Sequence, residues 1–360
     1  ERKVHVNVQP QAYDVRIAAG LLDGVGPAVR VVSKSKRVGI VADSNTAPLF
    51  AERVTASLNA AGFEIVTATL PAGEANKTLS ALLPVYDTFL TAKFERSTPV
   101  LALGGGVVGD MTGFVSATLL RGVPFVQIPT TLLSMVDASV GGKTGVDHAV
   151  GKNLIGAFHQ PAAVLIDPAV LTTLPSREFR SGLAECVKHM IIRDAGGFDS
   201  MEANLADILN LNPAKLIDLI AANVKIKARV VEADPFERGE RAHLNFGHTF
   251  GHAIETLSNY DYAHGEAISL GMTAATFAAR ELKMIDDATR RRIIALLSRI
   301  GLPTTGLTLD VDQVVNAMWF DKKVASGKIR FVLPERIGAV IIRDDVPREL
   351  IRAAVESLKG

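Results

Sequence analysis

The second half of the chain carries a group of histidines at a spacing that suits metal binding. His248 and His252 are four residues apart, so a helix would present both imidazoles on one face. His264 follows shortly after, and Glu185 precedes them in an apolar segment that also holds Lys188. Two histidines and a glutamate make a three-ligand zinc set, which leaves a fourth position open for substrate. Spacing alone predicts His248 and His252 as the ligand pair. The alternative is that one of the histidines is a buried core residue.

A glycine-rich segment in the first half has the pattern of a nucleotide-binding loop. Gly104, Gly106 and Gly109 follow an apolar strand and precede a predicted helix. Glycines at these positions let the backbone approach a pyrophosphate, and the helix start offers free N–H groups to it. A tight turn without a ligand is the alternative. No acidic residue ends the strand that lies about 20 residues further on, where a ribose-binding carboxylate is usual. Asp43, at the end of an earlier strand, is therefore the better candidate for that role.

Two lysines flanked by glycines, Lys143 and Lys152, lie close together downstream of this loop. Ammonium groups beside exposed backbone amides suit the capture of an anion. Lys143 belongs to a GGKT run, but the glycine spacing of an ATP-binding P-loop and the following helix start are missing, so we reject an ATPase. Two solvated surface lysines are the alternative. Because the neighbouring residues are Gly, Val, Leu, Ile and Phe, we predict that these lysines line a crevice.

The elements that must position these residues differ between the two halves of the chain. Short β-branched runs alternate with helical patterns up to Asp167, which indicates a mostly parallel sheet with crossover helices. From Ser176 onward a helical period prevails, apart from a predicted hairpin over 329–342. We therefore predict an α/β domain over residues 1–175 and an all-α domain over residues 176–360. The predicted strands cover 38–42, 64–70, 99–103, 125–128 and 163–167, and the predicted helices cover 47–61, 79–92, 111–120, 177–192, 198–209, 213–232, 246–258, 264–282, 287–300 and 311–320.

Composition excludes several classes of partner and site. The 360 residues include 39 Lys and Arg and 38 Asp and Glu, and the resulting net charge of +1 gives no general attraction to nucleic acid or to an anionic membrane. No uncharged stretch reaches the length of a membrane span. Cys186 is the only cysteine, which excludes a disulfide or a cysteine zinc cluster within the chain. We expect a reducing compartment and a small-molecule ligand, with no nucleic acid and no membrane partner.

Taken together, these motifs resemble the 3-dehydroquinate synthase family of sugar-phosphate cyclases. GGGVVGD, GKNLIGAF, GLAECVK, LNFGHTFGHAIE, HGEA and DKK occur in this order between Gly104 and Lys323, and GKNLIGAF and LNFGHTFGHAIE are very specific. The resemblance implies an N-terminal Rossmann-like NAD domain and an α-helical metal- and substrate-binding domain, the fold shared by dehydroquinate synthase and glycerol dehydrogenase. It implies NAD and a divalent metal as cofactors, Zn²⁺ with Co²⁺ as the alternative. It further implies a cytoplasmic homodimer.

The resemblance also assigns roles to individual residues. The implied metal ligands are Glu185, His248 and His264. The implied catalytic residues are Lys188, Glu237, Asn245 and His252. The implied substrate contacts are Arg121, Asp137, Lys143, Asn153, Lys188, Lys227, Arg241, Asn245 and one lysine of the DKK run, taken as Lys322. The implied cofactor contacts are Asp43, Asn45, Glu74, Lys77, Gly105, Gly106, Val107, Asp110, Thr130, Thr131, Lys143 and Lys152. The resemblance thus moves His252 from the metal to proton transfer, and Arg121 would reach the active site of a partner subunit.

The implied reaction converts 3-deoxy-D-arabino-heptulosonate 7-phosphate into 3-dehydroquinate and phosphate, in the shikimate pathway of aromatic amino acid biosynthesis. It runs through transient oxidation by NAD, phosphate elimination, re-reduction, ring opening and an intramolecular aldol closure. Three other functions compete with it. A cyclase that makes an inosose or a valiolone should lack carboxylate partners such as Arg241. A polyol or alcohol dehydrogenase would release NADH. A non-catalytic nucleotide sensor is disfavoured by the intact metal set.

Overall fold

The structure, a computed structural model, describes residues 1–237, 239–259, 261–320 and 329–360. Contacts between residues divide the chain into two units. This division differs from a single boundary between residues 175 and 176, because a later segment of the chain groups with the first unit. The first unit consists of Glu1–Leu174 and Pro213–Phe236, and the second of Pro175–Asn212 and Glu237–Gly360.

The first unit is built on a seven-stranded sheet in the order β1-β2-β9-β6-β5-β3-β4. Neighbouring strands are parallel except β1 and β2, which pair antiparallel. All five residues of β5 are buried, as expected for a parallel sheet that is covered on both faces. Strands β1 and β2 lie outside the predicted set, because polar and apolar residues alternate in them. The strands are β1 (Arg2–Val6), β2 (Tyr13–Ile17), β3 (Arg37–Asp43), β4 (Glu64–Leu70), β5 (Val100–Gly104), β6 (Phe125–Pro129) and β9 (Ala163–Ile166).

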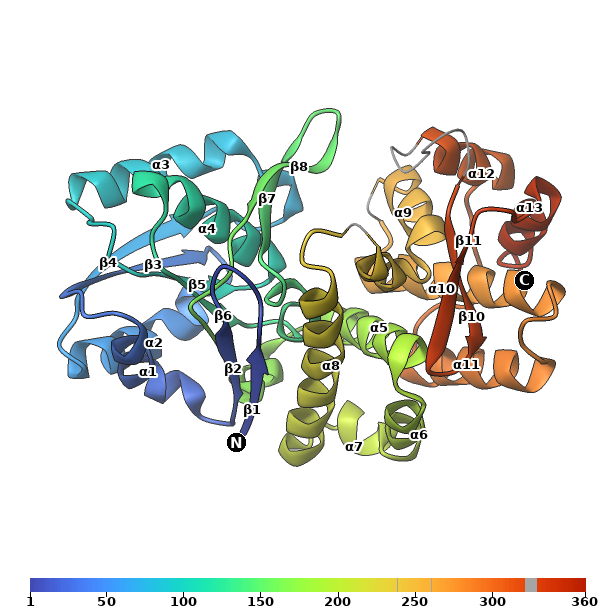
Figure 1. Ribbon diagram of the computed structural model, residues 1–360, viewed down its shortest axis with the longest axis horizontal. Helices are drawn as coiled ribbons and strands as arrows, with labels where there is room; N and C mark the ends of the chain where they lie inside the picture. The colour runs from blue at the N-terminus through green and yellow to red at the C-terminus, as the bar shows by residue number, and fades with distance from the viewer. Residues whose placement is uncertain (238, 260, 321–328) are drawn as a thin grey trace. The chain divides into compact units, whose positions relative to one another are not determined.

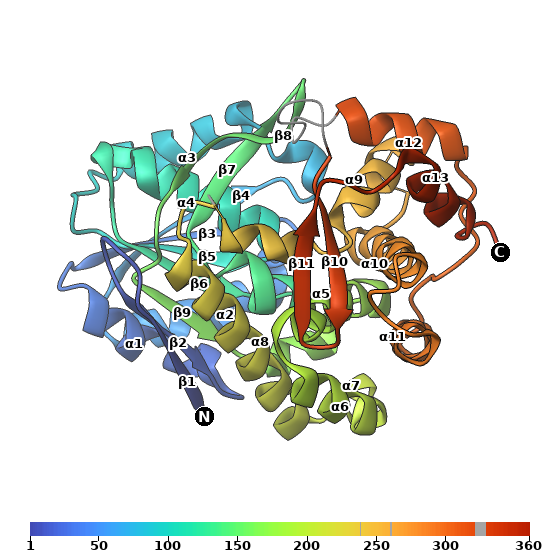
Figure 2. The ribbon, with the colours of Figure 1, turned by 45° about the vertical axis from the view of Figure 1, so that its right-hand side comes forward.

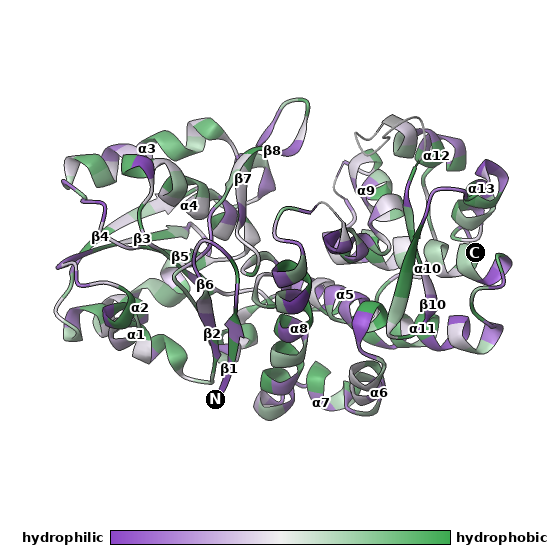
Figure 3. Ribbon diagram, viewed as in Figure 1, coloured by the Kyte–Doolittle hydropathy of each residue, from purple (hydrophilic) through white to green (hydrophobic). Residues whose placement is uncertain are grey.

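Helices cover both faces of this sheet. Figure 1 shows α3 and α4 on one face and α1 and α2 on the other. Helix α8 joins the unit from a later part of the chain and packs against β1 and β2. Figure 3 shows hydrophobic and hydrophilic stretches alternating along α8, the pattern of a helix with one buried face. The helices are α1 (Val25–Val32), α2 (Ala47–Ala60), α3 (Leu79–Thr91), α4 (Gly106–Thr118) and α8 (Pro213–Ala233).

The order of the strands reverses at β3, the neighbour of the edge strand β4. Strand β4 lies on one side of β3, whereas β5, β6 and β9 follow on the other side. In sheets of this kind, ligands bind outside the carboxyl ends of the strands at the point of reversal. That point falls between β3 and β5, whose last residues are Asp43 and Gly104. The predicted ribose carboxylate and the predicted glycine loop therefore lie at the same edge of the sheet.

The lysine-rich segment forms a separate antiparallel hairpin of β7 (Lys143–His148) and β8 (Gly151–Phe158). Its strands approach closely at paired glycines: a Cβ atom on Gly156 would lie 2.1 Å from the carbonyl oxygen of Thr144. The sequence predicts no strand here, because glycines and lysines interrupt the apolar residues. The hairpin holds three of the residues predicted to meet anions, Lys143, Lys152 and Asn153.

Helices make up most of the second unit. Strands β10 (Phe331–Arg336) and β11 (Ala339–Arg343) pair antiparallel and lie against α10 and α5 (Figure 2). The unit is therefore helical with one hairpin rather than all-α. Among the described residues, no helix of either unit combines the length and the hydropathy needed to cross a membrane. The helices are α5 (Ser176–Arg193), α6 (Ala195–Ala203), α7 (Leu205–Leu209), α9 (His248–Leu257), α10 (His264–Glu281), α11 (Asp287–Ile300), α12 (Val311–Phe320) and α13 (Arg348–Glu356).

Glycines let α5, α9 and α10 approach one another closely. A Cβ atom on Gly271 of α10 would lie 2.0 Å from the carbonyl oxygen of Gly247, the residue before α9. A Cβ atom on Gly265 would lie 2.3 Å from the carbonyl oxygen of Ser181 on α5. Both distances are far below van der Waals contact, so a larger residue would push the helices apart. The first residues of α9 and α10 adjoin these contacts, and the packing therefore fixes where both helices start.

Replacing Gly271 by alanine should lower the melting temperature by several degrees, because the new methyl group would collide with backbone. Overpacking of this kind costs about 1–3 kcal/mol. Differential scanning calorimetry measures the change. Gly196→Ala is the matched control: this glycine also lies in a helix of the second unit, but the nearest atom to a new Cβ there is a side-chain oxygen at 3.7 Å. Equal melting temperatures of the two variants would contradict the close contact.

Candidate active site

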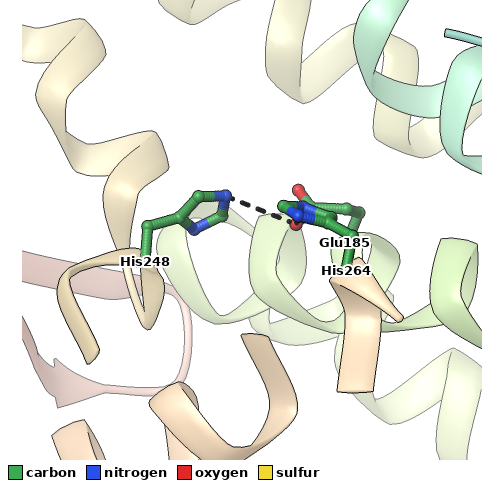
Figure 4. Close-up of side chains that lie close together, drawn as sticks. All are labelled: Glu185, His248 and His264. Carbon is green, nitrogen blue, oxygen red and sulfur yellow. Dashed lines mark ion pairs between the residues drawn. The ribbon is translucent and has the colours of Figure 1, made fainter. Parts of the chain in front are cut away.

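Three side chains from three helices of the second unit converge on one point (Figure 4). Glu185 lies in the middle of α5, His248 is the first residue of α9, and His264 is the first residue of α10. The Glu185 side chain is fully buried. Its Oε1 lies 3.6 Å from Nε2 of His248 and 3.4 Å from Nε2 of His264. Two imidazoles and one carboxylate thus face a common centre.

The spacing of these atoms suits a tetrahedral divalent cation. Nitrogen and oxygen ligands lie ~2.0–2.1 Å from zinc, which separates two of them by roughly 3.4 Å at the tetrahedral angle. The measured separations from the carboxylate oxygen are 3.4 and 3.6 Å, and all three ligand atoms lie within 4.8 Å of one another. Catalytic zinc sites use this donor set and leave one position for substrate. The residues therefore fit the divalent metal that the resemblance implies.

Further contacts orient both imidazoles. Nδ1 of His248 lies 3.1 Å from the carbonyl oxygen of Phe246 and donates to it, which leaves Nε2 as the unprotonated nitrogen. Nδ1 of His264 lies 3.5 Å from Oε2 of Glu255, a buried carboxylate on α9. Partners of this kind fix the tautomer and the ring orientation of histidines that bind metals. Each imidazole therefore presents Nε2 to the common centre.

Burial and the neighbouring charges determine how these groups ionise. Burial and the Lys188 ammonium lower the pKa of His248 to about 3, so this imidazole is neutral, as a metal ligand must be. Burial also acts to lower the pKa of His264, but hydrogen bonds and charges from Glu185 and Glu255 outweigh it and raise that pKa to about 9. Lys188 is buried one turn along α5 and pairs with the other oxygen of Glu185. The buried carboxylates therefore favour positive charge at the centre.

His252 lies one turn beyond His248 on α9, beside the same group. Its ring centre is 5.0 Å from that of His248 and 6.4 Å from that of His264. Among the described residues, one cluster with metal-ligand spacing joins Glu185 and His248 to His264, and no such cluster includes His252. The pair predicted from spacing is therefore not the pair that the structure brings together around the carboxylate.

The other residues predicted in this unit lie in the turns that precede α9. Arg241 and Asn245 belong to a short 3₁₀ helix, Glu240–Asn245, and Arg241 is only 2% exposed. Nδ2 of Asn245 donates to Oε1 of Glu237 at 3.4 Å. Glu237 is exposed and has a left-handed φ of 57°, a strained conformation for a glutamate of the kind that concentrates at functional sites. Lys322 lies outside the described residues.

In the first unit, the glycine loop forms the turn from β5 into α4. Gly105 precedes the helix and brings no side chain to cap it, so the first-turn N–H groups face no side-chain cap and suit an anion. A Cβ atom on Gly109 would lie 2.7 Å from Oε1 of Gln127 on β6, the close helix-to-strand packing that the last glycine of this pattern permits. The Thr130 N–H donates to the carbonyl of Gly104 at 2.9 Å, which brings the end of β6 beside the loop.

Asp43 ends β3 next to this loop. Its Oδ1 accepts hydrogen bonds from the backbone N–H groups of Asn45 and Thr46, at 3.0 and 2.7 Å. The Thr46 hydroxyl donates to the carbonyl of Leu103 at 3.1 Å, which ties the end of β3 to the end of β5. A carboxylate at a strand end beside a glycine loop suits the ribose of a dinucleotide. The residues of this edge therefore fit NAD.

Most of the charged residues predicted in the first unit pair with one another. The ion pair between Lys77 and Asp110 is the most buried of these, since only 5% of the lysine side chain is exposed. Burial acts to lower the pKa of Lys77, but the charges of Asp110 and Glu74 outweigh it and raise that pKa. Lys143, at the start of β7, is exposed. Ion pairs at 2.6, 2.7 and 3.3 Å join, respectively, Lys77 to Asp110, Lys227 to Asp137 and Lys152 to Glu74.

Arg121 lies at the far end of α4 from the glycine loop. It is the last residue of a short 3₁₀ helix, Leu119–Arg121, and is exposed. Because α4 has 13 residues and a helix rises about 1.5 Å per residue, roughly 20 Å separate its two ends. Arg121 is therefore remote from the glycine loop of its own chain.

Two residues outside the predicted set also support the metal ligands. Glu255 orients His264, and the Ser181 hydroxyl accepts a hydrogen bond from the Gly265 N–H at 2.8 Å, which anchors the start of α10 on α5. Both leave a signal in the sequence: Ser181 precedes Glu185 by four residues and Glu255 follows His248 by seven, so each shares a helix face with a ligand. Spacing identifies that face but not the helix that packs against it.

Two family models match consecutive parts of the chain. The model described as 3-dehydroquinate synthase N-terminal matches residues 67–181, and the model described as 3-dehydroquinate synthase C-terminal matches residues 182–324. Together they span well over half of the sequence. The chain belongs to the 3-dehydroquinate synthase family.

Curated 3-dehydroquinate synthases match this chain over nearly its whole length. The enzyme from Nostoc punctiforme is 46% identical over 359 residues, which is 99% of each chain. The enzyme from Rippkaea orientalis is 47% identical over 356 residues, which is 98% of this chain and 97% of the relative. The family recognised from the motifs is thereby confirmed.

Solved structures of other sugar-phosphate cyclases and of dehydrogenases share the fold. The 2-epi-5-epi-valiolone synthase from Streptomyces hygroscopicus, with NAD⁺ and Zn²⁺ bound, is 30% identical, with a TM-score of 0.90 and 98% of both chains covered. A 2-deoxy-scyllo-inosose synthase complexed with carbaglucose-6-phosphate, NAD⁺ and Co²⁺ is 23% identical, with a TM-score of 0.91 over 99% of this chain and all of that one. A probable glycerol dehydrogenase from Sinorhizobium meliloti has a TM-score of 0.66 at 15% identity, over 96% of this chain and 95% of that one. The predicted fold class is confirmed, and the predicted hairpin over 329–342 is present in the second unit as β10 and β11.

His248→Ala should lose its metal on dialysis, whereas His252→Ala should keep it, because only His248 belongs to the cluster with Glu185 and His264. Loss of a proton-transfer group should slow turnover by ~10²–10⁴-fold while the metal stays. Elemental analysis of the dialysed protein, beside a turnover assay, measures both effects. Thr249→Ala, between the two histidines, is the control that should keep metal and turnover. If His252→Ala loses its metal on dialysis and His248→Ala retains it, His252 is the ligand and the assignment of His248 is wrong.

Proposed function

We infer that this chain catalyses the 3-dehydroquinate synthase reaction, the conversion of 3-deoxy-D-arabino-heptulosonate 7-phosphate into 3-dehydroquinate and phosphate. The observation that carries this conclusion is the 46–47% identity to curated 3-dehydroquinate synthases over nearly the full length. The cyclases with other products are less similar, at 30% and 23% identity. The enzyme is an NAD- and metal-dependent carbon–oxygen lyase of the shikimate pathway.

The two cofactors belong to different units of the chain. When bound, NAD supplies a reversible hydride acceptor and a divalent metal supplies a Lewis acid for the hydroxyl that is oxidised. Glu185, His248 and His264 would hold the metal through one oxygen and two nitrogens. The edge of the sheet at β3 and β5 would hold the dinucleotide. The proposed cofactor residues there and nearby are Asp43, Asn45, Glu74, Lys77, Gly105, Gly106, Val107, Asp110, Thr130, Thr131, Lys143 and Lys152.

The substrate has two anionic groups, a carboxylate and a phosphate, and different side chains suit the binding of each. A guanidinium offers a carboxylate two parallel N–H donors, and Arg241 is the proposed partner. Its burial supports this role, because little water competes for a guanidinium that is 2% exposed. Lysines and an amide suit the phosphate, which accepts from several directions. The proposed substrate contacts are Arg121, Asp137, Lys143, Asn153, Lys188, Lys227, Arg241, Asn245 and Lys322.

Proton transfer is proposed for residues beside the metal ligands. His252 lies 5.0 Å from His248, ring centre to ring centre, so its imidazole can move a proton next to the polarised hydroxyl without binding the metal. Asn245 donates to Oε1 of Glu237 and orients that carboxylate as a second acid or base. Lys188, whose Nζ pairs with Oε2 of Glu185, is the proposed partner for negative charge that develops nearby.

A homodimer and a cytoplasmic location complete the proposal. The position of Arg121 supports the first: it is exposed and roughly 20 Å from the glycine loop of its own chain, at the other end of α4. An arginine there serves a substrate bound by a second copy better than one bound by its own chain.

The enzyme loaded with NAD and Zn²⁺ should release one phosphate for each heptulosonate phosphate consumed and should accumulate no NADH, because the hydride returns within each turnover. A colorimetric phosphate assay and the absorbance of NADH measure the two quantities. Enzyme from which NAD has been removed is the control and should release no phosphate. NADH equal to the product would indicate a dehydrogenase, and missing phosphate release would refute the proposed reaction.

Arg241→Lys should lower kcat/KM by the equivalent of about 1.5–3 kcal/mol, because lysine cannot restore a bidentate pair with the substrate carboxylate. Steady-state kinetics with the heptulosonate phosphate measure this loss. Arg343→Lys is the matched control, since Arg343 forms a surface fork with Asp345, at 2.6 Å for both bonds, in the same unit. An Arg241→Lys enzyme as efficient as this control would reject the carboxylate contact.

A further inference from the structure

One arginine side chain joins the last turn of α5 to the 3₁₀ helix Glu240–Asn245. Arg193 is the last residue of α5, and 32% of its side chain is exposed. Its Nη2 donates to Oε1 of Glu240 at 2.5 Å and lies 2.9 Å from Nδ1 of His243. A single nitrogen thus meets two residues of the 3₁₀ helix, and Arg241 lies between these two in the sequence.

The contact with His243 is a hydrogen bond that the imidazole accepts. A guanidinium can only donate, so Nδ1 of His243 is the unprotonated nitrogen and the proton lies on Nε2. Burial and the charge of Arg193 lower the pKa of His243, although the charge of Glu240 acts to raise it, and the imidazole is therefore neutral at pH 7. Arg193 thus has two acceptors on one short helix, a carboxylate and a neutral imidazole.

The 3₁₀ helix that Arg193 contacts carries two of the proposed substrate residues, Arg241 and Asn245. A 3₁₀ helix this short has poorer hydrogen-bond geometry than an α-helix, so contacts with other elements must fix its position. Helix α5 and the strands β10 and β11 pack against it. Because α5 also carries Glu185 and Lys188, the contact made by Arg193 sets the place of the substrate residues against the helix of the metal site.

Hydrogen bonds continue from the end of this helix to a metal ligand. The N–H of Phe246 donates to the carbonyl oxygen of His243 at 3.1 Å, and Nδ1 of His248 donates to the carbonyl oxygen of Phe246 at 3.1 Å. The start of α9 is fixed independently by the close packing at Gly247. Loss of the Arg193 contact should therefore displace the substrate residues and leave the metal ligand in place.

We propose that Arg193 is a positioning residue: it holds the 3₁₀ helix Glu240–Asn245 against α5, so that the guanidinium of Arg241 keeps the place from which it binds the substrate carboxylate. The proposal rests on the proposed function for the identity of that carboxylate. Arg193 lies eight residues beyond Glu185 on α5, roughly 12 Å at about 1.5 Å per residue, so it acts through Arg241 and not by contact with the substrate. Exposed ion pairs contribute little to stability, and the effect of Arg193 therefore falls on substrate binding and not on folding.

Two variants of Arg193 test the proposal by steady-state kinetics of the enzyme loaded with NAD and Zn²⁺. Arg193→Met removes both hydrogen bonds and should raise KM for the heptulosonate phosphate about tenfold, while kcat and the Kd of zinc stay within about threefold of the wild type. Arg193→Lys should keep KM within about threefold, because one nitrogen serves both partners and an ammonium has three donors. Arg292→Met is the matched control and should keep KM, since Nε of Arg292 pairs with Oε2 of Glu202 at 2.8 Å between two other helices of this unit.

Hydrogen exchange followed by mass spectrometry tests the hold on the 3₁₀ helix without any substrate. The backbone amides of residues 240–245 should exchange about tenfold faster in Arg193→Met than in the wild type, because local opening sets the exchange rate. In Arg292→Met they should exchange at the wild-type rate. The melting temperatures of both variants should lie within about 3 °C of the wild type, as expected for exposed ion pairs.

The double variant Arg193→Met/Arg241→Lys tests whether one residue acts through the other. If Arg193 acts through Arg241, KM of the double variant is no higher than that of Arg241→Lys alone; independent effects would multiply. Multiplied effects, a KM of Arg193→Met equal to that of Arg292→Met, or unchanged exchange over residues 240–245 would each overturn the proposal. Hydrogen exchange gives its answer even if the wild type releases no phosphate from the heptulosonate phosphate, a result that would refute the proposed function separately.

Discussion

The second unit is organised around one carboxylate that has no contact with water. An ionised side chain in the middle of a buried helix costs several kcal/mol unless opposite charges or donors meet it. Glu185 meets Lys188 from its own helix and the two imidazoles from α9 and α10, and a dication at their common centre would add the largest compensation. These partners come from different helices, so the helices must approach more closely than ordinary side chains allow. The glycines at 247, 265 and 271 provide that approach, and the metal-ligand geometry follows from it.

In the first unit, the order of the strands determines where the charged residues lie. The strand order reverses between β3 and β5, which brings Asp43 and the glycine loop together at the carboxyl ends of these two strands. The loop follows β5 and not the first strand of the unit, so the ribose carboxylate comes before the loop in sequence and not after it. Lys77, in the loop after β4, then pairs with Asp110 of α4, and Lys152 of the hairpin pairs with Glu74 of that loop.

Sequence reasoning predicted well what depends on neighbours along the chain. Five strands of the large sheet and most helices of the second unit were predicted close to their observed bounds, because apolar runs or a clear helical period mark them. Helix α13 was not predicted, and one predicted helix over 198–209 covers both α6 and α7. It did not predict β1 and β2, where polar residues alternate with apolar ones, nor the β7–β8 hairpin, whose pairing depends on glycines that carry no pattern of their own. The segment 213–236 was assigned to the second domain because the helical period says nothing of the partner on which a helix packs.

Sequence spacing also does not reveal which histidines meet around the carboxylate, because that depends on how helices pack. Spacing of four residues correctly places His248 and His252 on one helix, but a metal site needs ligands from several elements. The third ligand, His264, comes from the first turn of the next helix, and its contact with Glu185 depends on how α10 docks against Ser181. Only the resemblance to a known family supplied that information in advance. For Lys77, the resemblance implies a cofactor contact, and the structure adds hydrogen bonds from its ammonium to Asp110 and Asn153.

Both imidazoles of the ligand set belong to the opening turns of their helices, whereas the carboxylate lies in the middle of a buried one. Terminal turns open and close far more often than the interior of a bundle, with little loss of the remaining structure. Two of the three ligands can therefore move only together with the packed first turns of α9 and α10, whereas the third belongs to the interior of α5. Any change that shifts the start of α9 or α10 relative to α5 would therefore alter the distances between the ligand atoms, even if no ligand is itself replaced.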